Sequence, residues 1–178
     1  ATFDPQVARE LTAKVRPYGS WIKGHYTDDV SNPEEYPLSG MGAANVGPEF
    51  TISEYDALAE LETEEKALYD EGKVAKLSNM TDTLNSLVHK SGRWRKWLLA
   101  DEQGSDLNEL SPERFQWIVK TCSRYIWQHP EALAARQSLY ENLDRVGIDA
   151  EEMLLGRIEH DMDKYYNAFN LIDLNKWL

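Results

Sequence analysis

Apolar residues recur at intervals of three or four positions through much of the chain, which is the spacing of amphipathic helices. The clearest stripe begins after Pro130, and Gly147 is expected to end its helix. Asp149 is placed to cap a last long helix, and Ser111 marks the start of an earlier one. The pattern predicts four or five helices after residue 51. The stripe after Pro130 consists of Ala132, Ala135, Leu139, Leu143 and Val146.

The first fifty residues carry shorter apolar runs. Residues 4–14 are predicted to form a helix with Asp4 as its N-cap, and residues 20–26 and 43–46 are predicted to be strands. Residues 27–42 between the strands are rich in Pro, Gly and acids, and loops of this length often serve as functional lids. Two strands cannot make a self-sufficient parallel sheet. We therefore expect the α/β class, with the last two strands of a TIM-type barrel followed by a mainly helical C-terminal extension.

A capping-box pattern at residues 51–54 predicts that the next helix begins there and runs to about Tyr69. This segment is strongly acidic, and a solvated helix face is the simplest interpretation of its charge. The expected division of the chain is residues 1–70, the terminal strands and helix of an α/β barrel, and residues 71–178, a helical extension.

Composition narrows the possible functions. The chain has 178 residues, a formal charge of −12 and a pI of about 4.8. Such acidity argues against a nucleic-acid partner and gives no support for binding to an anionic membrane. A single cysteine, Cys122, permits no intrachain disulfide, so a reducing, cytoplasmic compartment is expected. No apolar run approaches a transmembrane span. The first residue is Ala rather than Met, which suggests a chain processed, trimmed or cut from something longer.

Candidate chemistry follows each predicted strand. His25 comes at the end of the first, and a neutral imidazole there could bind a divalent metal, with Asp28 orienting its other nitrogen or acting as an acid or base. A hydrogen-bonded loop histidine is the alternative. Asn45 and Gly47 follow the second strand and could contact substrate oxygens or a phosphate, helped by the next helix N-terminus. A strand-to-helix turn that needs Gly is the alternative.

Two further clusters combine bases and aromatic residues. Residues 93–97 could form a phosphate or partner patch, or an amphipathic turn with buried Trp, which is the simpler interpretation. Residues 124–130 are interpreted as a packed corner between helices. Cys122 lies on an apolar stripe, which favours a core position over a nucleophile.

The order of three short motifs resembles the tagatose-bisphosphate aldolase non-catalytic-subunit family, which has ketose and uronate epimerase relatives. The family pattern EAHSTDYQ is matched by His25, Thr27 and Asp28, and the pattern LKVGPALTF by residues 46–48 and Thr51. The family motif RIRYYWPHP is similar to SRYIWQHP. Its matches here are Arg124, Tyr125, Trp127, His129 and Pro130.

The resemblance implies a barrel related to class II ketose-bisphosphate aldolases, acting on ketoses or sugar phosphates as a supporting subunit or as an epimerase. It also implies a divalent metal, with zinc favoured, for which His25 is a candidate ligand. The expected partners are the remaining barrel or a catalytic subunit, within an oligomer. Lys23-Gly24 and Asn45 depart from the family pattern, which has Glu-Ala and usually Lys there, so the sugar is left open.

A different class of function is also consistent with the residues. The chain could be a non-catalytic helical interaction module that stabilises a partner, with Trp94, Trp97 and Trp127 as anchors. Stoichiometric metal bound through His25 would favour the enzyme over the module.

Overall fold

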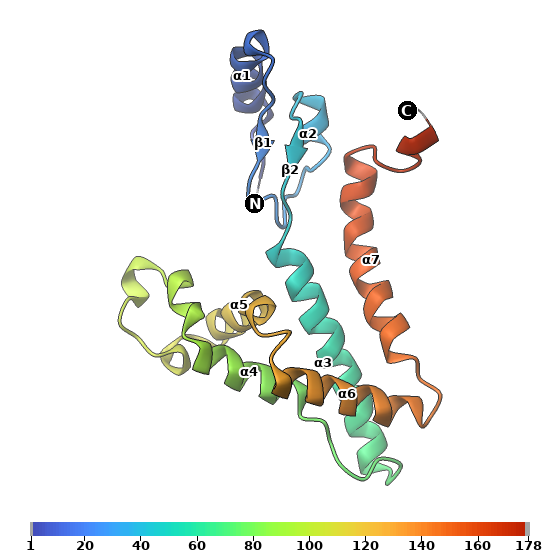
Figure 1. The fold of residues 1–178 in the computed structure, drawn as a ribbon. Helices are drawn as coiled ribbons and strands as arrows, with labels where there is room; N and C mark the ends of the chain where they lie inside the picture. Colours follow the sequence, from blue (N-terminus) through green and yellow to red (C-terminus); the bar gives the residue numbers. More distant parts are fainter. Residues whose placement is uncertain (1, 177–178) are drawn as a thin grey trace. The chain divides into compact units, whose positions relative to one another are not determined.

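The computed structural model describes residues 2–176, and these fall into two compact units (Figure 1). The first, here called the sheet unit, comprises the chain up to Phe50 together with the residues from Glu159 onward. The second, the helical unit, is Thr51–Ile158. This division differs from the expected one at residue 70, because the end of the last long helix belongs with the N-terminal segment.

The sheet unit contains one parallel pair of very short strands (Figure 1). Helix α1 (Pro5–Val15) begins as predicted, because the Asp4 carboxylate accepts hydrogen bonds from two backbone N–H groups of the first turn. The helix is followed by the 3₁₀ turn η1 (Arg16–Tyr18), β1 (Lys23–Gly24), α2 (Glu35–Leu38) and β2 (Ala43–Ala44). The strands predicted over 20–26 and 43–46 were both too long, since only Lys23–Gly24 and Ala43–Ala44 pair. At the end of the first, Tyr26 adopts a φ of +58° and leaves the extended region.

Tyr36 of α2 packs against β1 and explains a glycine in that strand. A Cβ atom at Gly24 would overlap the Tyr36 ring. The same ring stacks on Phe3, with 3.9 Å between the ring centroids. The predicted loop of 27–42 therefore contains a short helix that covers the sheet.

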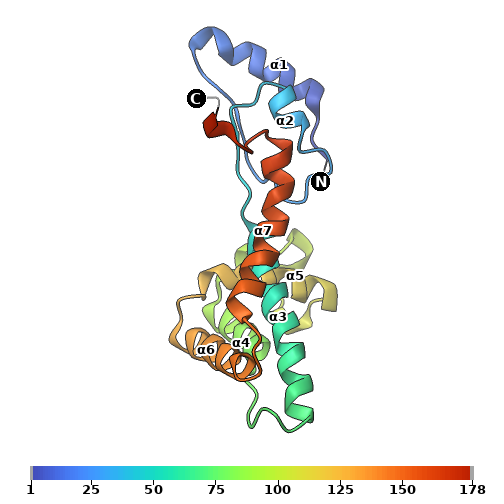
Figure 2. The same ribbon diagram turned by 90° about the vertical axis from the view of Figure 1, so that its right-hand side faces the viewer.

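The helical unit is built from most of α3 (Pro48–Asp70), the first half of α7 (Ala150–Ala168) and three helices between them. These are α4 (Met80–Ser91), α5 (Pro112–Cys122) and α6 (Pro130–Asp144). The connecting 3₁₀ turns are η2 (Arg93–Trp97), η3 (Ala100–Glu102), η4 (Leu107–Glu109) and η5 (Ser123–Tyr125), and η6 (Leu174–Lys176) follows α7. Helix α4 packs against both α5 and α6 (Figure 2).

The apolar stripes predicted in the second half face this core. Ala132, Ala135, Leu139 and Leu143 are buried, whereas Val146 is 38% exposed beyond the end of α6. The cap predicted at Asp149 is confirmed, since its carboxylate accepts a hydrogen bond from Glu152 N at 2.9 Å. Within residues 2–176, no helix is both long and apolar enough to cross a membrane.

Glu65 is a fully buried carboxyl group that joins three segments of the helical unit. It accepts hydrogen bonds from Ser78 N at 3.0 Å and Ser78 Oγ at 2.7 Å, and from the Asn142 amide. The same amide nitrogen donates to the Lys76 carbonyl at 2.9 Å. Asn142 therefore ties α6 to α3 and to the connection that follows α3.

Asn142→Ala should destabilise the protein by about 1–3 kcal/mol, because the buried Glu65 carboxyl group loses one of its donors and the Lys76 carbonyl loses the Asn142 amide. Urea denaturation followed by circular dichroism measures this free energy. Gln137→Ala, on the exposed face of the same helix, is the control and should change it by less than about 0.5 kcal/mol. Equal effects of the two substitutions would contradict this account.

Candidate functional site

The carboxyl ends of β1 and β2 bring two of the predicted site residues together. In the parallel register Gly24 pairs with Ala44, so His25 and Asn45 stand one position beyond the paired residues. The ladder continues there, with Asn45 N donating to Gly24 O at 3.1 Å and Thr27 N donating to Asn45 O at 2.9 Å. Both His25 and Asn45 are exposed. They are therefore presented side by side from one edge of the sheet, where parallel sheets commonly carry functional groups.

Asp28 lies at the N-terminus of α3 and acts there as a cap. Its Oδ1 accepts hydrogen bonds from Gly47 N at 2.9 Å and from Glu49 N at 2.8 Å. A carboxylate at this position satisfies helix N–H groups and interacts favourably with the helix dipole. The backbone N–H of Gly47 is thus already engaged by Asp28. The helix begins at Pro48, and the prediction that Thr51 starts it was wrong, because the capping group comes from twenty positions earlier in the chain.

Glu49 connects the segment after β1 with the end of α7. Its carboxylate accepts a hydrogen bond from Asp29 N at 2.7 Å and forms an ion pair with Lys164 Nζ at 3.1 Å. The Tyr165 hydroxyl donates to the same carboxylate and lies 3.1 Å from the Thr27 carbonyl. No functional role was predicted for Glu49 or for Tyr165. Their contact spans more than a hundred positions, so no local pattern signals it.

The pKa values at this junction follow from burial and from neighbouring carboxylates. Burial raises the pKa of Asp29, and the nearby charge of Glu49 raises it further. Burial also raises the pKa of Tyr165 well above the ordinary value for tyrosine, and its hydrogen bond to Glu49 adds to this shift. Tyr165 is therefore a neutral donor at any physiological pH, as its bond to a carboxylate requires.

The predicted metal ligand His25 has few companions. Its ring contacts the edge of Tyr26, with 4.4 Å between the centroids. Within residues 2–176, no group of three or more His, Cys, Asp or Glu side chains is arranged to hold a metal ion. A catalytic zinc site needs three protein ligands. This part of the chain does not form such a site by itself, and the metal stays a prediction.

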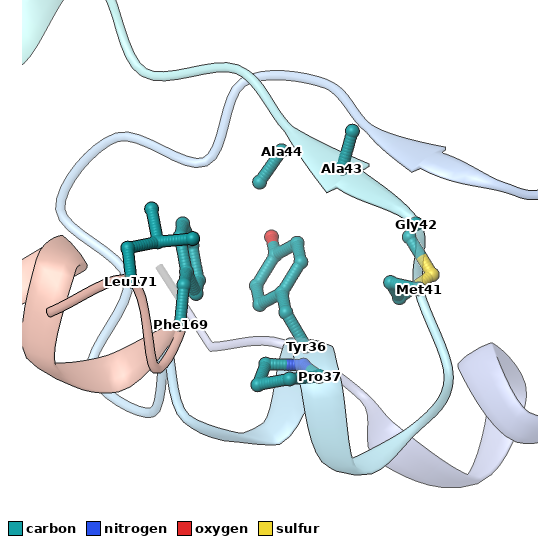
Figure 3. Close-up of a pocket in the computed structure, with 8 residues that line it drawn as sticks. All are labelled: Tyr36, Pro37, Met41, Gly42, Ala43, Ala44, Phe169 and Leu171. Atoms are coloured by element: carbon teal, nitrogen blue, oxygen red, sulfur yellow. The ribbon is translucent and has the colours of Figure 1, made fainter. Parts of the chain in front are cut away.

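An apolar cavity of about 300 Å³ lies beside β2 in the sheet unit (Figure 3). Figure 3 shows the Tyr36 ring projecting into it, with the hydroxyl group directed toward Ala44 and with Phe169 and Leu171 alongside. Among residues 2–176, the lining offers one hydroxyl group and no ionisable acid or base other than Tyr36. The cavity is suited to an apolar group, but it lacks the groups needed for proton transfer.

The other candidates from the sequence occupy structural positions. Trp94 is completely buried and donates its indole N–H to the His89 carbonyl at 3.1 Å, so it cannot serve as an anchor for a partner. Cys122 is buried too, and burial raises the pKa of its thiol to about 11. Such a thiol is a poor nucleophile. His89 lies 3.0 Å from the Asp106 carboxylate, a partner that the sequence pattern did not indicate.

The fold is thus a mainly helical α/β arrangement with a strand-end site. The family model described as "D-tagatose-1,6-bisphosphate aldolase subunit GatZ/KbaZ-like" matches residues 1–169. The chain belongs to this family, as its three motifs indicated.

A crystal structure of a "probable tagatose 6 phosphate kinase" from Sinorhizobium meliloti 1021 shares the fold, with a TM-score of 0.72 at 21% identity. The match covers 94% of this chain and 48% of that one, so this chain spans about half the length of its solved relative.

Two curated proteins show a weaker similarity. The serine/threonine-protein kinases spk-1 of Caenorhabditis elegans and Caenorhabditis briggsae are each 22% identical to this chain over 148 residues. That match covers 76% of this chain but only 15% and 13% of the two kinases. At this identity and coverage, the similarity assigns no activity to this chain.

Tyr165→Phe should destabilise the protein by about 0.5–2 kcal/mol at pH 7, because the Glu49 carboxylate loses a buried donor. Urea denaturation provides the measurement. The neighbouring Tyr166→Phe removes a hydroxyl group from a side chain that is 39% exposed, and it should have little effect.

The difference between wild type and Tyr165→Phe should shrink above about pH 10, where tyrosine ionises in the unfolded chain but Tyr165 stays neutral in the folded one. A raised folded-state pKa stabilises the protein fully below the unfolded pKa, and this stabilisation is lost as the pH rises above it. A difference that grows with pH would contradict the assignment.

Proposed function

We propose that this chain is the C-terminal part of a supporting subunit of a D-tagatose-1,6-bisphosphate aldolase. The observation that carries the proposal is the family match over residues 1–169, which includes both strand ends and the helices that follow. Within residues 2–176, no group of side chains is arranged to hold a metal ion, so metal-dependent aldol cleavage would need ligands from outside this part of the chain.

The two strands are proposed to be the last two of a TIM-type barrel. Strands of two residues each, with unpaired outer edges, are far too short for a parallel sheet that folds alone. The rest of the barrel would come from polypeptide corresponding to the half of the solved relative that this chain does not match. This arrangement would place His25 and Asn45 at the mouth of the barrel, where such enzymes carry their chemistry.

In that setting, His25 would be one ligand of a divalent metal, zinc by preference, and Asn45 would contact substrate oxygens. Asp28 and Gly47 would position the segment through the bond that they share, instead of acting on substrate directly. A ketose epimerase is the competing activity, and it would require a complete metal site within one polypeptide. The cytoplasm is the proposed location.

Reconstitution tests the supporting role. The longest natural form of the protein and a class II tagatose-bisphosphate aldolase catalytic subunit from the same source are purified separately and mixed, and cleavage of D-tagatose 1,6-bisphosphate is followed by a coupled assay. We expect no cleavage by the chain alone, co-elution of the two proteins on size exclusion, and a several-fold longer half-life of the catalytic subunit. Cleavage by the chain alone, or absence of both co-elution and protection, would refute the proposal.

His25→Ala tests the metal role in the longest natural form of the protein. Loss of one ligand should weaken zinc binding by roughly 10–100-fold, because each protein ligand contributes strongly to affinity. Metal content is measured by mass spectrometry after dialysis against a graded chelator. His160→Ala, at an exposed position of α7, serves as the matched control and should leave metal content unchanged. If His25→Ala also leaves it unchanged, His25 is not a ligand.

A further inference from the structure

A group of cations surrounds one tyrosine on the surface of the helical unit. The Arg93 Cζ and Lys96 Nζ atoms each lie 4.4 Å from the centroid of the Tyr125 ring, and the Arg124 Cζ atom lies 5.0 Å from it. Arg124 Nη2 also donates to the Tyr125 hydroxyl at 2.9 Å. Three positive charges therefore lie around one aromatic ring, although a single cation is enough for a cation–π interaction.

These cations are not neutralised by the acids of an otherwise acidic chain. Within residues 2–176, neither Arg93, Lys96 nor Arg124 forms an ion pair with a carboxylate, whereas Arg114 and Lys120 of α5 are each paired with one. The same three cations act on the buried thiol of Cys122. The positive charges of Arg124, Lys96 and Arg93 lower the pKa of this thiol, although burial raises that pKa by more. The local field is positive although the formal net charge is −12.

The positions of the side chains leave this charge open to solvent. Arg93 and Lys96 belong to η2 and are exposed. Arg124 and Tyr125 belong to η5 and are half-buried. Trp94, from the same turn as the two exposed cations, is buried in the core and fixes that turn. Since the Tyr125 oxygen accepts a bond from Arg124, its own hydrogen is free to be donated outward.

We propose that Arg93, Lys96, Arg124 and Tyr125 form a binding site for a compact phosphate monoester. Guanidinium groups, an ammonium group and a hydroxyl donor are the groups that recognise phosphate oxygens. A phosphate dianion balances the charge of three cations better than the single negative charge of a carboxylate does. Burial raises the pKa of Tyr125, but hydrogen bonds from Lys96 and Arg124 outweigh it, so the net pKa lies below the usual value for tyrosine. This site is independent of the aldolase assignment.

Isothermal titration of the 178-residue chain with inorganic phosphate, at constant ionic strength in a phosphate-free buffer, tests the site. We expect saturable binding of one phosphate with a dissociation constant on the order of 1 mM, as a few exposed charge-assisted contacts provide. Arg93→Gln and Lys96→Gln should each weaken it about fivefold, and Tyr125→Phe several-fold. Arg93 and Lys96 are exposed, so these two variants should fold, and circular dichroism verifies this.

Arg95→Gln is the matched control. Arg95 has the same charge, belongs to the same turn and is exposed, but it lies over Trp94 instead of Tyr125, 4.7 Å from that ring. It should change phosphate affinity less than twofold. Non-saturable binding, or equal weakening by Arg95→Gln and Lys96→Gln, would show only general charge attraction and overturn the proposal. Saturable binding of a Glu-rich peptide with no binding of phosphate would overturn it in favour of a protein partner.

Discussion

Two carboxylates at the start of α3 organise the sheet unit. Asp28 holds the first N–H groups of the helix, and Glu49, one residue into that helix, holds Asp29, Lys164 and Tyr165 in return. The segment after β1 is therefore fixed from both sides. The exposed ring of His25 takes part in none of these bonds.

This network holds the loop in place, while His25 and Asn45 are exposed at the strand ends, and within residues 2–176 no group of side chains is arranged to hold a metal ion. In the proposed supporting role, the chain would present these few groups accurately while another polypeptide supplied the remaining chemistry.

Local signals in the sequence were sufficient for most of the helices. Asp4, Ser111 and Asp149 each cap the helix that they precede, because capping bonds connect neighbouring residues. The start of α3 was missed because its cap, Asp28, is supplied across a tertiary contact. Glu49 and Tyr165 were missed for the same reason, whereas His25 and Asn45 could be placed at one edge because strand ends in parallel sheets coincide. Their chemical roles could not be derived, since these depend on residues elsewhere.

The fit of Gly24 against Tyr36 restricts how this region can change in evolution. The tyrosine ring occupies the volume that any β-carbon at residue 24 would need. A methyl group at residue 24 is therefore compatible only with a smaller side chain at residue 36, or with a displaced α2. The two positions should covary in related sequences. Where residue 24 is larger than glycine, residue 36 should have a smaller side chain than tyrosine.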